Sequence, residues 1–114
     1  APAWQDPPHG VQGSLPSVKD ADILVDTTPL GMDPHIDDEP IAKAENMHED
    51  LVVFDAVYNP NETVLLKEAI KAGAKPVYGI KMLLYQGAES FKIWTGVDAP
   101  IDVMENALRD TLNL

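Results

Sequence analysis

Two short, unbroken runs of apolar residues constrain the fold of this chain most. Ile23, Leu24 and Val25 form the first, and residues 51–58 form the second, which is β-branched and apolar almost throughout. A continuous apolar run of this length is typical of a strand that is covered on both faces of a parallel sheet. Each run ends at turn-forming residues, the first at Pro29 and Gly31 and the second at Asn59-Pro60. The sequence therefore predicts two parallel strands.

A helix and a third strand follow. Asn61 or Thr63 is placed to cap a helix that continues through Ala72, with Gly73 in the C-terminal stop position. Its expected buried residues are Leu65, Leu66, Ala69 and Ile70. Residues 75–78 are expected to form a third, short strand.

Two further helices complete the chain. In residues 79–96 the apolar side chains recur three and four apart, which predicts one buried stripe made of Ile80, Leu83, Leu84, Gly87, Phe91 and Trp94. Asp98 is expected to cap a final helix with Pro100 in its first turn and with Ile101, Met104, Leu108 and Leu112 facing inward. Residues 33–50 are predicted to be an irregular loop with one helical turn at 41–44.

The order strand, loop, strand, helix, strand, helix, helix indicates an α/β fold. We expect a partial Rossmann-like parallel sheet of about three strands with flanking helices. Three strands are few for a buried-type sheet, so residues 21–114 are interpreted as the C-terminal half of a nucleotide-binding domain with its C-terminal helices. Residues 1–20 are rich in Pro and Gly and are interpreted as a linker-like segment. Because the chain begins at Ala1 inside that tract, we expect a piece of a longer protein or a processed product.

Charge and composition narrow the function. The formal net charge of -11 argues against nucleic acid or an anionic membrane as a partner, because phosphates would be repelled. The chain has no cysteine, which excludes disulfides and thiolate metal ligands. No apolar run approaches the roughly 20 residues that span a bilayer, and no signal peptide is visible, so a cytoplasmic location is expected. We interpret His35, Asp37, Asp38 and Glu39 as a solvated acidic loop, not as a metal site.

Polar residues cluster where the three predicted strands end. They are the segment 27–32 after the first strand, Tyr58-Asn59-Pro60 after the second, and Gly79 with Met82 and Gln86 after the third. Ligands of open parallel sheets bind beyond the carboxyl ends of the strands. Thr hydroxyls and the backbone at Gly31 can hydrogen-bond a ribose or a phosphate. Tyr58 offers a phenol to a carboxylate or hydroxyl. Met82 and Gln86 stand four residues apart on one flank of the predicted helix, and this pair suits a flat, partly polar ligand.

Three segments resemble the shikimate dehydrogenase family. The segment Ala21-Asp22-Ile23-Leu24-Val25-Asp26-Thr27-Thr28-Pro29-Leu30-Gly31-Met32 is similar to its DILVNTTPLGM motif. Residues 53–60, with Thr63 and Leu65-Leu66, resemble VFDxVYNPxxTxLL, and residues 79–96 resemble the helix GxxMLxxQGAxxFxxWTG. The resemblance extends from about residue 21 to the C-terminus, and three motifs in order make it specific.

The resemblance implies an NADP-dependent reduction of 3-dehydroshikimate to shikimate, in aromatic amino acid biosynthesis. It implies that Gln86 binds the substrate hydroxyls and that Tyr58 lies near the substrate carboxylate. It also assigns to NADP the residues Thr27, Thr28, Pro29, Leu30, Gly31, Met32, Ala56, Gly79 and Met82. The cofactor supplies the hydride, so the protein mainly positions the two reactants and supplies a proton.

The chain departs from the family pattern in several places. Asp26 stands where the family usually has Asn, and it is expected to repel a phosphate; Ala56 often corresponds to a larger apolar residue. No Gly-rich phosphate loop is present, nor the basic segment that reads the 2′-phosphate. The family's catalytic Lys and Asp belong to an N-terminal substrate domain with no counterpart here. We therefore expect no catalytic residue in this chain and no turnover by the chain alone.

Two alternatives stay open. The chain is either part of such an enzyme or a non-catalytic module that binds a nucleotide, a missing N-terminal half or itself through the edge of the first strand. These residues do not distinguish shikimate from quinate as the substrate, or NADP from NAD as the cofactor.

Overall fold

The computed structural model describes residues 18–114, which form a three-stranded parallel sheet in the order β1-β2-β3 with helices around it. The strands are β1 (Ile23–Asp26), β2 (Val52–Asp55) and β3 (Lys75–Val77). The helices are the 3-10 turn η2 (Ala44–Asn46) and the α-helices α2 (Val64–Lys71), α3 (Ile80–Thr95) and α4 (Ile101–Leu112). The predicted fold class, a partial Rossmann-like α/β sheet, is confirmed. The segment 1–17 of the predicted linker lies outside the described residues.

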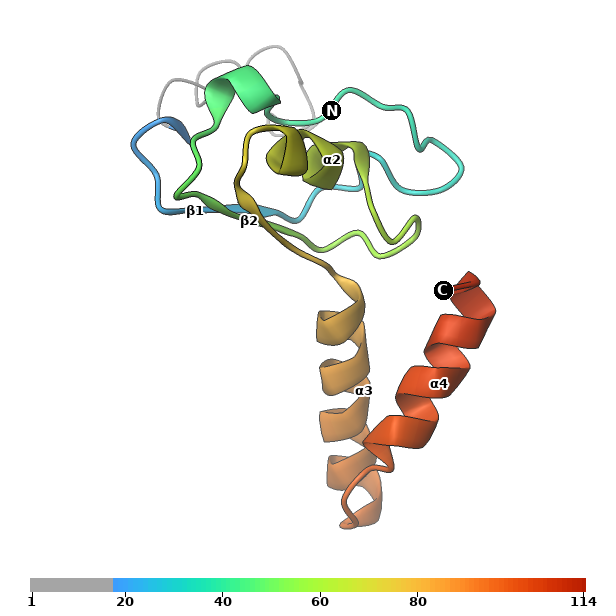
Figure 1. The fold of residues 1–114 in the computed structure, drawn as a ribbon. Helices are drawn as coiled ribbons and strands as arrows, with labels where there is room; N and C mark the ends of the chain where they lie inside the picture. The colour runs from blue at the N-terminus through green and yellow to red at the C-terminus, as the bar shows by residue number, and fades with distance from the viewer. Residues whose placement is uncertain (1–17) are drawn as a thin grey trace, which may run out of the picture.

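One face of the sheet holds the core. Leu24 of β1 pairs with Val53 of β2 in the parallel register, so both side chains point to the same face. Helix α2 covers that face, as Figure 1 shows, and it contributes buried apolar residues on its inner side. The buried cluster comprises Val18, Ala42, Met47, Leu51, Val53, Leu65, Leu66, Ala69 and Ala74.

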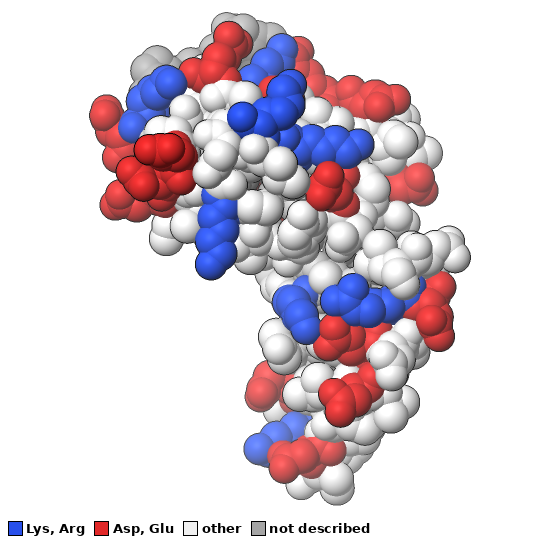
Figure 2. All heavy atoms as spheres, in the orientation of Figure 1, with Lys and Arg blue, Asp and Glu red and all other residues white. Residues whose placement is uncertain are grey.

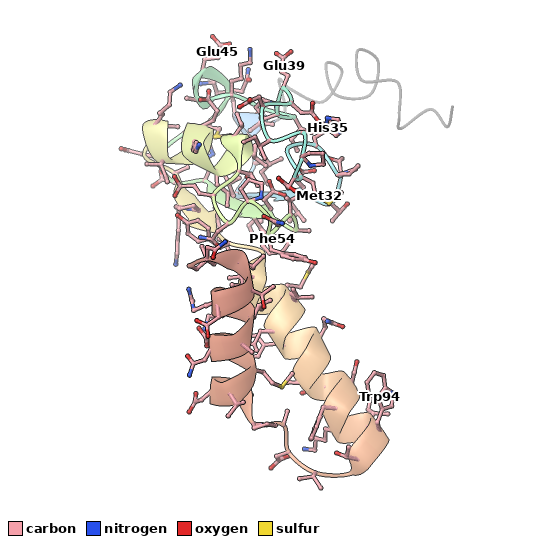
Figure 3. All side chains as sticks on the ribbon, turned by 90° about the vertical axis from the view of Figure 1, so that its right-hand side faces the viewer. Met32, His35, Glu39, Glu45, Phe54 and Trp94 are labelled. Carbon is pink, nitrogen blue, oxygen red and sulfur yellow. The ribbon has the colours of Figure 1, made fainter. Side chains whose placement is uncertain are left out.

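The opposite face of the sheet is open in the described part of the chain. Ile23 is 62% exposed and Val25 is 53% exposed, and their β2 neighbours Val52 and Phe54 are only half-buried. Helices α3 and α4 extend away from the sheet (Figure 1), and Phe54 lies on the side from which they project (Figure 3). The prediction that the first strand is covered on both faces is therefore wrong for these residues, because α2 covers only one of them.

Local sequence signals set the ends of α2. Thr63 is the N-cap, and its hydroxyl oxygen accepts a hydrogen bond from the Leu66 N–H at 3.3 Å. Gly73 follows the helix with a φ of 76°, a left-handed conformation that favours glycine. Leu65, Leu66 and Ala69 are buried as predicted, whereas Ile70 is exposed because it lies on the flank that faces away from the sheet.

The two C-terminal helices pack on each other more than on the sheet. The predicted stripe on α3 is buried or half-buried through Phe91, but Trp94 is 80% exposed at the far end of the helix (Figure 3). Asp98 does not cap α4: its carboxylate pairs with Lys92 at 3.2 Å, and α4 begins after Pro100 without a side-chain cap. The helical turn expected at 41–44 is found three residues later, as η2.

Gly79 connects β3 to α3 and is a position where only glycine fits. A Cβ added there would lie 2.6 Å from the Asp55 carbonyl oxygen and 2.7 Å from that of Ala56. Both oxygens belong to the backbone at the end of β2 and cannot rotate away.

We expect Gly79→Ala to lower the free energy of unfolding by about 1–3 kcal/mol, because it forces this backbone apart. Gly87→Ala is the matched control, since its Cβ would meet Met104 Cε at an ordinary 3.5 Å and alanine favours a helix interior by about 0.5–1 kcal/mol. Chemical denaturation of both variants checks this. Equal stability of the two variants would show that the junction at Gly79 is not tightly packed.

Candidate functional site

A pocket of about 410 Å³ lies at the carboxyl ends of β1 and β2. The loop that follows each strand contributes one wall. The lining residues are Thr27, Thr28, Pro29, Met32 and Asp33 from the first loop, and Ala56, Val57, Tyr58 and Asn59 from the second. This is the edge of a parallel sheet at which ligands of such folds bind. Figure 3 labels Met32 at this edge.

A buried carboxyl group shapes the first wall. Asp26, the last residue of β1, is 2% exposed. Its Oδ1 accepts hydrogen bonds from the Thr28 N–H at 2.8 Å and from the Thr28 hydroxyl at 2.7 Å. The Thr28 Oγ1 in turn accepts from the Leu30 N–H at 3.3 Å. The turn after β1 is therefore held by a chain of hydrogen bonds that starts at one carboxyl group.

A second buried carboxyl group shapes the other wall in the same way. Asp55, which stands opposite Asp26 in the register, is 0% exposed. Its Oδ1 accepts from the Val57 N–H at 3.0 Å, and its Oδ2 accepts from the Thr63 hydroxyl at 2.7 Å. Because Thr63 also caps α2, this carboxyl group ties the strand, the loop and the helix together.

Burial raises the pKa of the Asp55 carboxyl above its usual value. The hydrogen bonds from Thr63 and Val57 act in the opposite direction, because they stabilise the carboxylate, and the neighbouring Asp26 raises the pKa further. The native protein therefore binds a proton on Asp55 more tightly than the unfolded chain does.

The two walls are joined to each other. The Asp33 N–H donates to the Asn59 carbonyl at 2.8 Å, and the Ala56 N–H donates to the Asp26 carbonyl at 2.9 Å. Gly31 is buried between them with a φ of 83°, a conformation that other residues rarely adopt. These contacts place the pocket walls in one rigid unit.

The structure brings together some of the residues expected at the site and separates others. Those that line the pocket are Thr27, Thr28, Pro29, Met32, Ala56 and Tyr58. Leu30 and Gly31 form the turn behind that wall, and Gly79 packs against the backbone of Ala56. Met82 and Gln86 are exposed on α3 and do not line this pocket, and the Gln86 Nε2 donates to the Leu83 carbonyl at 3.0 Å.

Sequence reasoning did not identify Asp55, Asp33 or the bond between Thr63 and Asp55 as parts of the site. Asp55 was considered only as part of a strand motif, and Asp33 only as the start of a loop. The available signal was an acidic residue at the end of an apolar strand, since a buried carboxylate needs hydrogen-bond donors close by. Thr63 was expected only as a helix cap, and its bond to Asp55 depends on the tertiary fold.

Acidic side chains dominate the surface, but no metal site is found among residues 18–114. Figure 2 shows Asp and Glu along both sides of the sheet region and again on the two C-terminal helices. No group of three or more His, Asp or Glu side chains in this range is arranged to hold a metal ion. None of the helices in residues 18–114 combines the length and apolar character that crossing a membrane requires.

A parallel sheet with a pocket at the ends of two adjacent strands is the arrangement found in Rossmann-like α/β proteins. Comparison with known proteins narrows this class. The family model of the Shikimate 5'-dehydrogenase C-terminal domain matches residues 79–109. The chain resembles part of the shikimate dehydrogenases, and its residues 79–109 match the C-terminal domain of that family.

The similarity covers most of this chain and a minor part of each relative. A shikimate dehydrogenase (NADP(+)) from Methanobrevibacter smithii is 77% identical over 97 residues, which are 85% of this chain and 34% of the relative. A crystal structure of a shikimate dehydrogenase with NADP+ matches with a TM-score of 0.78 at 59% identity, over 81% of this chain and 32% of that one. A quinate dehydrogenase from Corynebacterium glutamicum with NAD matches with a TM-score of 0.78 at 30% identity, over 91% and 35%. The chain thus spans about a third of the length of the curated relatives it matches.

The raised pKa of Asp55 gives a pH dependence of stability with a defined sign. A carboxyl group whose pKa is higher in the native than in the unfolded state stabilises the fold below the unfolded value of about 3.9. This contribution is lost as the pH rises through the native pKa. As the pH rises from the unfolded pKa through the native pKa, we expect the free energy of unfolding of the native sequence to decrease relative to that of Asp55→Asn. The decrease is at most about 1.4 kcal/mol per pH unit.

Denaturant titrations at a series of pH values measure this difference. Taking the difference cancels the contributions of Glu68 and Glu105, whose pKa values are lowered by hydrogen bonds to Lys71 and Lys81, respectively. Asp50→Asn changes an exposed carboxylate and serves as the control. A pH profile of Asp55→Asn parallel to that of the native sequence would contradict the assignment.

Proposed function

We propose that this chain is part of a shikimate dehydrogenase that reduces 3-dehydroshikimate to shikimate with NADPH in the cytoplasm. The observation that carries the proposal is the pocket itself. Its two walls are the segments 27–33 and 56–59, and these coincide with two of the three family motifs. In this proposal residues 21–114 are the C-terminal half of the nucleotide-binding domain together with its closing helices.

The pocket fits one end of NADP better than the other. Its lining offers the hydroxyls of Thr27, Thr28 and Tyr58 beside the apolar side chains of Pro29, Met32 and Val57. Such a lining suits a ribose and a flat aromatic ring. None of the lining residues that the structure describes is Lys or Arg, so these residues offer no cation to a phosphate. We therefore assign it to the nicotinamide ribose, while the phosphates bind elsewhere in the parent enzyme.

The bound cofactor supplies the hydride, and residues of this chain orient the reactants. Thr27 and Thr28 hold the ribose from one wall, and the Ala56 backbone forms the other. The close approach of Gly79 to that backbone sets where α3 begins, and therefore the direction in which Met82 and Gln86 point. We assign Met82 to the nicotinamide and Gln86 to the substrate hydroxyls. To bind them, the Gln86 amide exchanges its bond to the Leu83 carbonyl for one to the substrate.

The open faces of the described structure support a missing partner. The exposed Ile23 and Val25 on the sheet, and Ile93 and Trp94 on α3, are large apolar residues without a covering element in residues 18–114. In the parent enzyme the N-terminal part, with the family's catalytic Lys and Asp, is the proposed neighbour. The second candidate is a non-catalytic module that self-associates, and the edge of β1, which pairs with no other strand of residues 18–114, favours it.

Quinate and NAD are the competing substrate and cofactor. The quinate dehydrogenase with NAD is as similar in fold as the shikimate dehydrogenase with NADP+, although its sequence identity is lower. The higher identity to NADP(+)-dependent shikimate dehydrogenases favours shikimate and NADP.

The test is a comparison of the 114-residue chain with the full-length protein that contains it. We expect NADP-dependent oxidation of shikimate by the full-length protein, followed through NADPH absorbance, and none by the 114-residue chain, which lacks an acid–base pair. Quinate and NAD, each supplied in place of its counterpart, measure the specificity. Activity of the short chain would contradict the assignment of catalysis to the missing part. An inactive full-length protein, with self-association of the chain in sedimentation, would favour the module.

Gln86→Ala in the full-length protein tests the substrate role. Loss of one hydrogen bond to a substrate hydroxyl is expected to lower kcat/KM for shikimate by about 10- to 100-fold. The affinity for NADPH is expected to stay the same. Glu89→Ala changes another exposed residue of α3 and is expected to leave both quantities unchanged. An equal loss in both variants would indicate damage to the helix and not loss of a substrate contact.

A further inference from the structure

Among residues 18–114, Asp33 is the only Asp, Glu, Lys or Arg that lines the pocket. Its backbone is held firmly, because its N–H donates to the Asn59 carbonyl at 2.8 Å on the opposite wall. The next turn adds a bond from the His35 N–H to the Met32 carbonyl, also at 2.8 Å. These two bonds fix the backbone that carries the exposed Asp33 side chain at the pocket wall.

The other acidic groups near the pocket differ from Asp33 in position. Asp26 and Asp55 are buried beneath the walls, and their carboxyl oxygens are engaged by Thr28, Val57 and Thr63. Asp37, further along the loop, is exposed like Asp33 but does not line the pocket. Within the described part of the chain, a ligand in the pocket thus has one carboxylate at the wall and no Lys or Arg among the lining residues.

A nicotinamide ring responds to such a charge in only one of its two redox states. The oxidised ring carries a positive charge and the reduced ring is neutral, whereas the phosphates and sugars of the two forms are the same. A carboxylate beside the ring therefore attracts the oxidised form more than the reduced form. Its effect on the phosphates is equal in both and cancels from the ratio of the two affinities.

We propose that Asp33 tunes this pocket toward the oxidised cofactor, which makes it a specificity-determining residue for the redox state of NADP. This inference rests on the proposed function, because it takes the pocket to be the nicotinamide site. In the direction of 3-dehydroshikimate reduction the oxidised form is the product. Asp33 then slows product release and favours shikimate oxidation at a given ratio of the two cofactor forms.

The experiment measures dissociation constants of NADP+ and NADPH for the full-length protein and two variants. NADPH binding is followed by its fluorescence, and NADP+ by competition. In Asp33→Asn we expect the ratio of the NADP+ constant to the NADPH constant to rise about threefold, the effect of one charge about 7 Å away in a water-like dielectric. Asp37→Asn removes the same charge from the same loop and is expected to leave the ratio unchanged. High salt is expected to shrink the effect.

Each other outcome has a distinct meaning. A ratio unchanged in Asp33→Asn overturns the inference, and so does an equal change in both constants, which would place Asp33 near the phosphates. A change of the same size in Asp37→Asn overturns it as well, since the effect would then come from net charge. If the native protein binds neither form, the proposed function itself fails.

Discussion

The pocket of this protein depends on two buried carboxyl groups at the ends of adjacent strands. A carboxyl group taken from water is tolerated only where donors surround it. Asp26 and Asp55 meet this condition by drawing in the N–H and hydroxyl groups of the residues that follow them. The hydrogen bonds that these two carboxyl groups accept therefore determine the conformation of the loops that follow the strands. These hydrogen bonds offset the desolvation cost of the two acids and also hold the loops rigid, as a binding site requires.

The one-sided sheet explains the shape of the rest of the structure. Helix α2 covers the face that contains Leu24 and Val53, and the opposite face stays open. Because Gly79 turns the chain away tightly against the end of β2, α3 and α4 leave the sheet and do not cover that face. The two helices stabilise each other instead, through Lys81 and Glu105 at 3.0 Å. The open apolar surface follows from this geometry, and it fits a chain that spans a third of its relatives.

Sequence reasoning succeeded where the signal is local. The presence of three strands, the Thr63 cap and the extent of α3 follow from short-range patterns, and the structure confirms them. The second strand is shorter than predicted, because it ends at Asp55 and residues 56–58 belong to the loop that lines the pocket. It failed where the outcome depends on partners far along the chain. Trp94 fits the helical stripe, but no element of the described residues reaches it. The Asp33 position in the pocket depends on its bond to the Asn59 carbonyl, which no periodicity encodes.

The two acidic residues at the first wall, Asp26 and Asp33, act on the site in different ways. Asp26 stands where the family usually has Asn, and we expected it to repel a phosphate. Its recorded partners, the N–H and hydroxyl of Thr28, are both donors, so a carboxylate serves the turn as well as an amide oxygen does. At 2% exposure Asp26 acts on a ligand mainly through the loop. Asp33 lines the pocket directly. In the proposed nicotinamide site, the charge that the described wall presents to a bound ring is therefore that of Asp33, a residue that follows the motif and does not belong to it.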